Sequence, residues 1–427
     1  MIQPLVPQAQ AANPGQYGFA PCEGGVCAAA GVRAAGVSAG FRRNPKRLDL
    51  ALVVADEGSV CAATFTQNRF CAAPVQISRE RAARHTARAI MLNSGNANAA
   101  TGEQGLQIAK ISSRKLAQAL GMTAPDVLVA STGVIGVQLP LGPFEHGIPL
   151  AVAALDASPA AAHDAACAVM TTDTVPKEVA VAGRLPATAD APARTVHVGG
   201  FVKGSGMIQP NMATMLAVIS TDAPLTPCAA QSALQAAVAR SFNKVTVDSD
   251  SSTNDSCFLL ATGAAGGPVI DQEGPEYAAV AEALAYVCEQ LARKIAADGE
   301  GATKLVTVDV IGAATPEDAD TVARSIANSP LVKTAIFGHD ANWGRIAGAA
   351  GKCGVDFDQT KVDIDLLGVP VCRAGLTVPF SEEEMLRLFS LAEVPIVVDL
   401  HMGDCATRVW TCDLTHDYVT INGDYRT

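Results

Sequence analysis

The chain has 427 residues, of which 49% are hydrophobic and only 17% are charged, a composition that supplies large cores and argues against disorder. Its formal net charge of −11 opposes binding to a polyanion, and with 4% aromatic residues it offers few surfaces for base stacking, so nucleic acid is not an expected partner. No apolar run reaches the length of a membrane span.

The cysteines and the first twenty residues bear on the compartment. Those twenty residues contain no Lys, no Arg and no compact apolar stretch, unlike a secretory signal. The 12 cysteines form no pair at the spacing of a metal knuckle, so we read them as reduced thiols packed as small hydrophobic residues. We therefore expect a soluble, cytoplasmic protein that binds no metal and no membrane.

Strands and helices alternate irregularly in the first half of the chain. Thr101 and Gln104 form a capping-box pattern, which predicts a helix that begins there and ends at Gly121, a typical stop signal. A second, Ala-rich helix is predicted at 156–170. The Pro- and Ala-rich stretch 184–196 is expected to be an exposed hairpin or linker. Strands are predicted where short apolar runs lead into polar loops: two joined by a turn within 49–66, one at 89–92 and one at 126–130.

The second half repeats this style. Apolar residues at three- and four-residue steps predict a long amphipathic helix over 280–295. Alternation predicts half-buried strands at 306–310 and 362–366, and three more short strands are expected at 395–400, 408–413 and 418–421. Strand pairs interrupted by single helices favour an α/β layered sandwich over an ordered βαβ winding.

Three polar, glycine-rich loops follow apolar strands, where functional sites usually lie. Residues 203–216 resemble a phosphate cradle but lack its spacing, and a plain turn into a buried strand is the alternative. Residues 248–255 begin like a calcium loop, but Thr253 and Leu259 stand where Gly and Glu are needed, which leaves a hydrogen-bonded loop. Residues 93–98 with 131–136 could form an oxyanion hole, or simply a steric turn.

Several other chemistries lack their motifs. There is no HExxH, no Gly-x-Ser-x-Gly and no GxGxxG between a strand and a helix, so a zinc protease, an α/β-hydrolase and a dinucleotide fold are unsupported. His339 could act as a base, but a single histidine beside a turn is more often structural.

Taken together, the motifs resemble the ornithine acetyltransferase family, the ArgJ-type enzymes of cyclic arginine biosynthesis. The segment KGSGMIQPNMATMLAVISTDA (203–223) is similar to the family's signature. Seven further segments fit the family in order and cover nearly the whole chain: NSGNANAATGEQG (93–105), VLVASTGVIGVQLP (127–140), MTTDTVPKE (170–178), DSDSSTND (248–255), DGEGATK (298–304), FGHDANWGR (337–345) and INGDYRT (421–427).

This resemblance implies a chain that cleaves itself between Ala213 and Thr214 into an α fragment (1–213) and a β fragment (214–427). The implied fold is a layered α-β-β-α sandwich of the kind shared with the DmpA aminopeptidases, with both fragments in one intertwined structural unit. The fragments are expected to stay associated and to assemble as an α2β2 heterotetramer.

The resemblance also implies the reaction. Thr214 would be the nucleophile and its freed α-amino group, with an ordinary pKa of about 7.7–8.0, the base. An acetyl group would pass from N-acetyl-L-ornithine to Thr214 and then to L-glutamate, without a cofactor; some relatives also use acetyl-CoA, and the motifs do not separate the two types. Thr132 and Gly133 would form the oxyanion hole, and the substrate-binding residues would be Thr172, Lys203, Thr214, Glu300, Asn422 and Thr427.

Some residues depart from the family's pattern. Gln209 stands where many relatives have His, and Ala341 replaces a common Pro. Two alternatives to the transferase also stay open at this point. One is an N-terminal-nucleophile aminopeptidase or amidase of the same fold, with water as the acyl acceptor. The other is an uncleaved relative that binds small molecules without catalysis.

Overall fold

The computed structural model describes residues 3–9, 11–187, 192–209 and 215–424, and divides into two compact units. Unit 1 takes its described residues from Met1–Ala11, Lys244–Ser249 and Ala292–Arg426, and unit 2 from Ala12–Asn243 and Asp250–Leu291. The expected cleavage point falls in the sequence of unit 2, so both expected fragments contribute to that unit. None of the described helices is long and apolar enough to cross a membrane.

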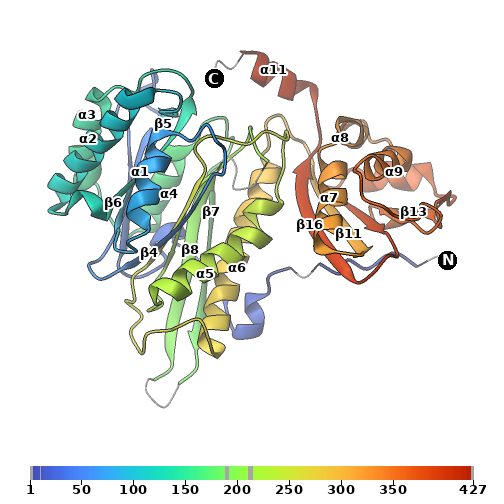
Figure 1. Cartoon of the computed structure of the whole chain (residues 1–427), viewed down its shortest axis with the longest axis horizontal. Coiled ribbons are helices and arrows are strands. Elements are labelled where there is room, and N and C mark those ends of the chain that lie inside the picture. The colour runs from blue at the N-terminus through green and yellow to red at the C-terminus, as the bar shows by residue number, and fades with distance from the viewer. Residues whose placement is uncertain (1–2, 10, 188–191, 210–214, 425–427) are drawn as a thin grey trace. The chain divides into compact units, whose positions relative to one another are not determined.

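Unit 2 is built on two sheets (Figure 1). The four-stranded sheet has the order β2-β3-β5-β6, and the six-stranded sheet has the order β1-β7-β8-β9-β10-β4. The strands of the first sheet are β2 (Val32–Val37), β3 (Leu50–Ala55), β5 (Ala89–Asn96) and β6 (Val127–Val134). Those of the second are β1 (Ala20–Pro21), β4 (Val60–Phe65), β7 (Lys177–Leu185), β8 (Arg194–Lys203), β9 (Leu216–Thr221) and β10 (Ser256–Ala261).

Strand β3 shows how the layers form, because its alternate residues face opposite sides of the sheet. Leu50, Leu52 and Val54 pack into the cluster that holds α2 (Gly102–Leu120) and α3 (Gly142–Ala153). Ala51 and Val53 pack into the cluster shared with the six-stranded sheet. Burial on both faces explains why β3 reads as a continuous apolar run.

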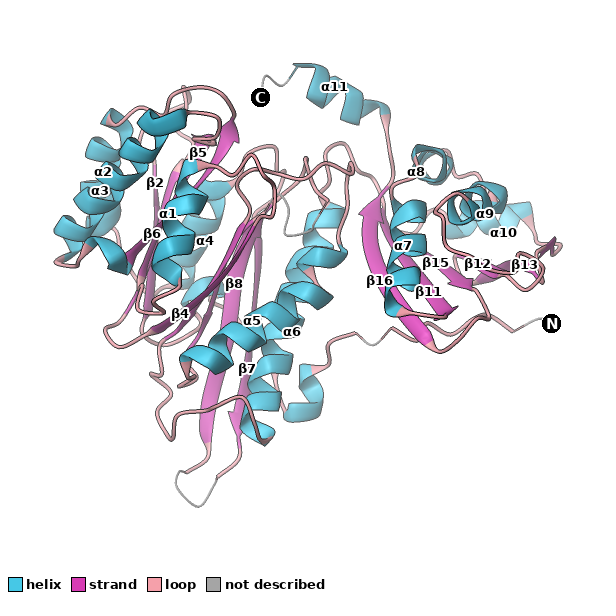
Figure 2. Cartoon of the chain, in the orientation of Figure 1, coloured by secondary structure: helices cyan, strands magenta, loops and turns pink. Residues whose placement is uncertain are grey.

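Helices α2 and α3 cover the outer face of the four-stranded sheet, as Figure 2 shows. The remaining helices of this unit are α1 (Ala73–Ala82), α4 (Pro159–Val169), α5 (Pro227–Arg240) and α6 (Pro275–Ala297), the last of which continues into unit 1. This arrangement confirms the predicted α/β layered sandwich. The strands predicted within 49–66 also form, but β3 and β4 belong to different sheets.

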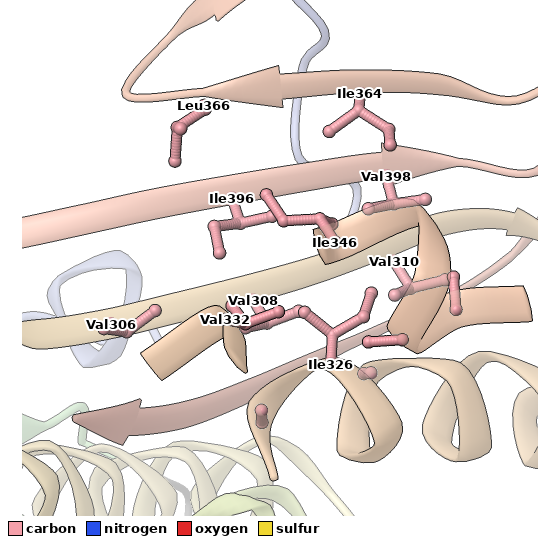
Figure 3. Close-up of a cluster of buried hydrophobic side chains, with 14 of the residues drawn as sticks. Val306, Val308, Val310, Ile326, Val332, Ile346, Ile364, Leu366, Ile396 and Val398 are labelled. Atoms are coloured by element: carbon pink, nitrogen blue, oxygen red, sulfur yellow. The ribbon is translucent and has the colours of Figure 1, made fainter. Parts of the chain in front are cut away.

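Unit 1 holds one mixed sheet with the order β14-β13-β12-β15-β11-β16. Aliphatic side chains from its strands and helices form one core, in which Val308, Ile326 and Ile396 are fully buried (Figure 3). The strands are β11 (Leu305–Ala313), β12 (Asp363–Leu366), β13 (Val369–Arg373), β14 (Leu376–Thr377), β15 (Glu393–Asp399) and β16 (Cys405–Cys412). The helices are α7 (Pro316–Ala327), α8 (Pro330–Phe337), α9 (Trp343–Gly351), α10 (Glu382–Leu388) and α11 (His416–Asp424).

Three local predictions are wrong. The strand predicted at 418–421 is part of helix α11, which begins after Thr415 accepts a hydrogen bond from the amide of Asp417 (3.2 Å). Thr101 is the N-cap residue of α2 but accepts no capping hydrogen bond, and its hydroxyl donates to Asn98 Oδ1 (2.8 Å). The strand predicted at 306–310 is β11, and it is buried on both faces and not on one, because its polar residues Thr307 and Asp309 are also buried.

Candidate active site

The ends of the parallel strands β5 and β6 bring together residues 93–98 and 131–136, the two segments of one predicted polar site. Gly95 pairs with Gly133 at this point, and the register is irregular there. Gly133 has φ +127°, and a Cβ on it would lie 2.4 Å from the carbonyl carbon of Gly95. Only glycine fits so close a contact between two backbones, so the turn beside Thr132 depends on this residue.

The polar loop 248–255 joins the same cluster through Asn254. Its side-chain amide donates to the carbonyl of Ala97 (2.6 Å) and to the carbonyl of Ser131 (2.9 Å). Ser131 in turn donates from its hydroxyl to Asn93 Oδ1 (2.7 Å). The loop 252–255 is therefore a buried hydrogen-bonded network, as one reading of its sequence predicted, and it fixes the ends of β5 and β6.

Lys203, at the end of β8, reaches the oxyanion residue expected from the sequence. The side chain is buried, and its Nζ lies 3.4 Å from Thr132 Oγ1 as a long hydrogen bond in which the lysine donates. An ammonium donor occupies a lone pair of the hydroxyl oxygen, so the Thr132 hydroxyl hydrogen must point elsewhere. The hydroxyl is thus oriented as a hydrogen-bond donor.

Asp173 holds this region together electrostatically. Its carboxylate accepts hydrogen bonds from Lys177 Nζ (2.7 Å), from the amide of Gly204 (2.7 Å) and from the amide of Thr171 (2.9 Å). Burial alone would raise the pKa of this carboxyl, but the charges of Lys203 and Lys177 outweigh it and hold the pKa well below its usual range. Asp173 is therefore ionised, and it ties the segment around Thr172 to the end of β8.

Two further predicted residues meet in unit 1. Glu300 is buried, and its Oε2 accepts a hydrogen bond from Asn422 Nδ2 (2.7 Å) in α11. Gly301 allows this contact, because its φ is +69° and a Cβ there would lie 2.6 Å from the amide nitrogen of Tyr418. The structure therefore brings Glu300 and Asn422 together although they are far apart in sequence.

The remaining predicted residues lie outside the described part of the chain: Ala213, Thr214 and Thr427. Met215, the first described residue after Thr214, donates from its amide to Asp255 Oδ1 (2.9 Å). Among the described residues no cluster of three or more His, Cys, Asp or Glu side chains could hold a metal ion.

Sequence reasoning missed two buried carboxyls of this region, Asp173 and Asp255. Both lie inside segments that carried the family resemblance, but neither was singled out. Two signals were available: Asp173 lies four residues before Lys177, and Asp255 directly precedes the apolar run of β10.

These features describe a layered α/β sandwich whose polar strand ends hold a lysine–threonine pair. The sequence model of the ArgJ family matches residues 33–427. An arginine biosynthesis bifunctional protein ArgJ from Symbiobacterium thermophilum is 48% identical over 95% of this chain and 99% of its own length. The chain belongs to the ArgJ family, which confirms the resemblance seen in its motifs.

Two solved structures are also similar. The crystal structure of an arginine biosynthesis bifunctional protein ArgJ from Bacillus halodurans is 43% identical, with a TM-score of 0.47, over 49% of this chain and 98% of that chain. An ornithine acetyltransferase from Mycobacterium tuberculosis, solved in complex with ornithine, is 37% identical, with a TM-score of 0.40, over 45% of this chain and 98% of that chain.

Proposed function

We propose that this protein is a glutamate N-acetyltransferase of arginine biosynthesis that moves an acetyl group from N-acetyl-L-ornithine to L-glutamate. Membership of the ArgJ family and the names of its relatives, which are arginine biosynthesis bifunctional proteins, support this function. The relative solved with ornithine supports an ornithine-type substrate. Within this chain, the observation that carries the proposal is the buried pair of Lys203 and Thr132 beside Gly133.

The reaction begins with self-cleavage. The hydroxyl of Thr214 attacks the carbonyl of Ala213, and the peptide C–N bond breaks as an ester forms, which frees the Thr214 amine. Water then hydrolyses this ester, which releases the Ala213 carboxylate and restores the Thr214 hydroxyl. That amine, with an ordinary pKa of about 7.7–8.0, then accepts the hydroxyl proton near neutral pH. The deprotonated Thr214 oxygen takes the acetyl group from N-acetylornithine and releases ornithine, whose nitrogen receives the proton.

The second half of the cycle returns the acetyl group to an amine. Glutamate attacks the ester on Thr214, a new amide bond forms, and the Thr214 hydroxyl is restored. Each half passes through a tetrahedral oxyanion, which the Thr132 hydroxyl and the Gly133 amide stabilise. Because Lys203 already donates to Thr132 Oγ1, the hydroxyl hydrogen is directed away from the lysine toward the oxyanion.

Charged substrate groups require partners of opposite sign. Lys203 and Glu300 are the proposed partners of the charged substrate groups, and Glu300 accepts a hydrogen bond from Asn422. Thr172 and Thr427 complete the proposed binding residues. Acetyl-CoA serves as a second acetyl donor, which makes the enzyme bifunctional. Neither reaction uses a bound cofactor. The two fragments stay together in a cytoplasmic α2β2 heterotetramer.

The direct test replaces the nucleophile. Thr214→Ala should abolish both cleavage and acetyl transfer, whereas Thr195→Ala, at an exposed position on β8, should leave both intact. Wild-type enzyme incubated with N-acetylornithine alone should gain the mass of one acetyl group on the fragment that begins at Thr214. Normal transfer by Thr214→Ala would contradict the proposed mechanism.

The acceptor is tested separately. Acetate and N-acetylglutamate are measured with and without glutamate. The proposed transferase forms N-acetylglutamate only when glutamate is present and releases little acetate. Acetate release at the same rate with and without glutamate would instead identify an amidase of the same fold.

A further inference from the structure

Asp255 occupies a position at the start of two paired strands. Strands β9 and β10 run parallel, with Leu216 opposite Ser256, so Asp255 lies beside Met215. Asp255 Oδ1 accepts the hydrogen bond from the Met215 amide (2.9 Å), and the amide of Ser256 donates to the Met215 carbonyl (3.1 Å). Met215 is thus held on both sides of its Cα, immediately after residue 214.

The carboxyl of Asp255 is completely buried and poorly compensated. Burial raises its pKa well above the usual range, and the Met215 amide and the charge of Lys203 oppose this only in part. The hydroxyls of Ser252 and Thr66 lie near, but Oδ2 has no hydrogen-bond partner of normal geometry among the described residues. A buried polar group with so few partners is expensive in free energy, which suggests a role beyond stability.

The opposite end of β9 provides a contrast. Asp222 follows that strand and is equally buried, but both of its oxygens are used. It accepts hydrogen bonds from the amide of His197 (2.7 Å), from His197 Nδ1 (2.7 Å) and from the amide of Ala30 (3.2 Å). Asp222 is therefore a structural carboxylate on the same strand, well suited as a control.

We propose that Asp255 is a positioning residue, which fixes the backbone of Met215 through its amide and thereby sets the place of the nucleophile Thr214 for self-cleavage and for acetyl transfer. This inference rests on the proposed function, because it needs Thr214 as the nucleophile. Thr214 is bonded directly to Met215, so a fixed Met215 nitrogen limits where the preceding residue can lie. Displacement of a reacting group by about 1 Å can cost about 100-fold in rate.

The test compares Asp255→Ala, Asp255→Asn and Asp222→Ala in the full chain. Cleavage is followed by intact mass, and kcat and KM for N-acetylornithine are measured on the cleaved material. Circular dichroism and thermal unfolding report the folded fraction. Asp255→Ala should slow cleavage and lower kcat about 100-fold with little change in KM, since a residue that acts through the Met215 amide alters the reacting group and not substrate binding.

Asp255→Asn should recover most of the lost rate, because the side-chain carbonyl of Asn can accept the same hydrogen bond from Met215. Asp222→Ala should lower the unfolding temperature while its folded fraction still cleaves at the wild-type rate. Equal cleavage and kcat in Asp255→Ala and wild type, or equal defects in the Asn and Ala variants, would overturn the inference. Either result leaves the proposed function standing as long as Thr214→Ala is inactive.

Discussion

The buried ionic cluster of unit 2, formed by Asp173, Lys177 and Lys203, contrasts with the aliphatic core of unit 1. The side chains of Lys177 and Asp173 in this cluster are each 1% exposed. In the core of unit 1 the buried side chains are uncharged, as at Val308, Ile326 and Ile396. Burying an ion costs several kcal/mol, and apolar side chains of similar size fill a core without that penalty. The aliphatic core of unit 1 therefore stabilises without compensation, whereas each charge of the unit 2 cluster depends on its partners.

The largest effect is expected from removing the carboxylate of the cluster. Asp173→Ala leaves two buried ammonium groups without this counter-charge and should lower the free energy of unfolding by about 3–5 kcal/mol. Urea denaturation followed by circular dichroism measures this change. Asp164→Ala, at an exposed position of α4, should change it by less than about 0.5 kcal/mol. Similar values for the two variants would show that the cluster is not stabilised as described.

Gly133→Ala should have the next largest effect, because its new Cβ would lie 2.4 Å from Gly95. We expect about 1–3 kcal/mol of destabilisation and a loss of acetyl transfer in the folded fraction. Gly136→Ala is the matched control, since Gly136 also has a positive φ (+79°) but its Cβ would meet nothing within 4 Å. Equal losses of activity in both variants would assign the effect to φ alone and contradict the packing argument.

The carboxyls of Asp173 and Asp255 should make the stability of the protein depend on pH with opposite signs. Asp173 has a lowered pKa, so its stabilising contribution is present above the unfolded value of about 3.9 and is lost as the pH falls through its folded pKa. Asp255 has a raised pKa, so its contribution is present below about 3.9 and is lost as the pH rises toward its folded pKa.

Urea denaturation over a series of pH values separates these contributions. Compared with wild type, Asp173→Asn should lose less stability on acidification below about pH 4, and Asp255→Asn should lose less between about pH 4 and neutrality. Parallel pH profiles for the wild type and both variants would contradict the two assignments.

The smallest effect is expected in the aliphatic core of unit 1. Ile326→Val removes one buried methylene and should cost about 0.5–1.5 kcal/mol, with unchanged kcat for the folded enzyme. Leu331→Ala, at a position that is 61% exposed, should cost less. A large fall in kcat for Ile326→Val would show that this core is coupled to the chemistry, against the comparison drawn above.

Local patterns predicted most of the elements because their causes are local. The apolar run of β3, the periodicity of α6 and the stop at Gly121 are visible in a short window of sequence. The segment 418–421 misled because alternating apolar residues resemble a strand, but no sheet edge pairs with it and it forms part of α11.

Long-range contacts were beyond local patterns. The three polar loops could each be named as candidates, but the contact of the loop 248–255 with the ends of β5 and β6 depends on Asn254, which bonds to residues 123 and 157 positions away. In the same way, the assignment of β3 and β4 to different sheets follows from packing on both faces of β3, which no pattern within 49–66 contains.

The intact mass of freshly purified protein under denaturing conditions tests the central claim most directly. The account predicts two species in equal amounts, of 213 and 214 residues, the second beginning at Thr214. A single species of 43.7 kDa that carries out acetyl transfer at full rate would contradict it, because the Thr214 amine would then never be formed.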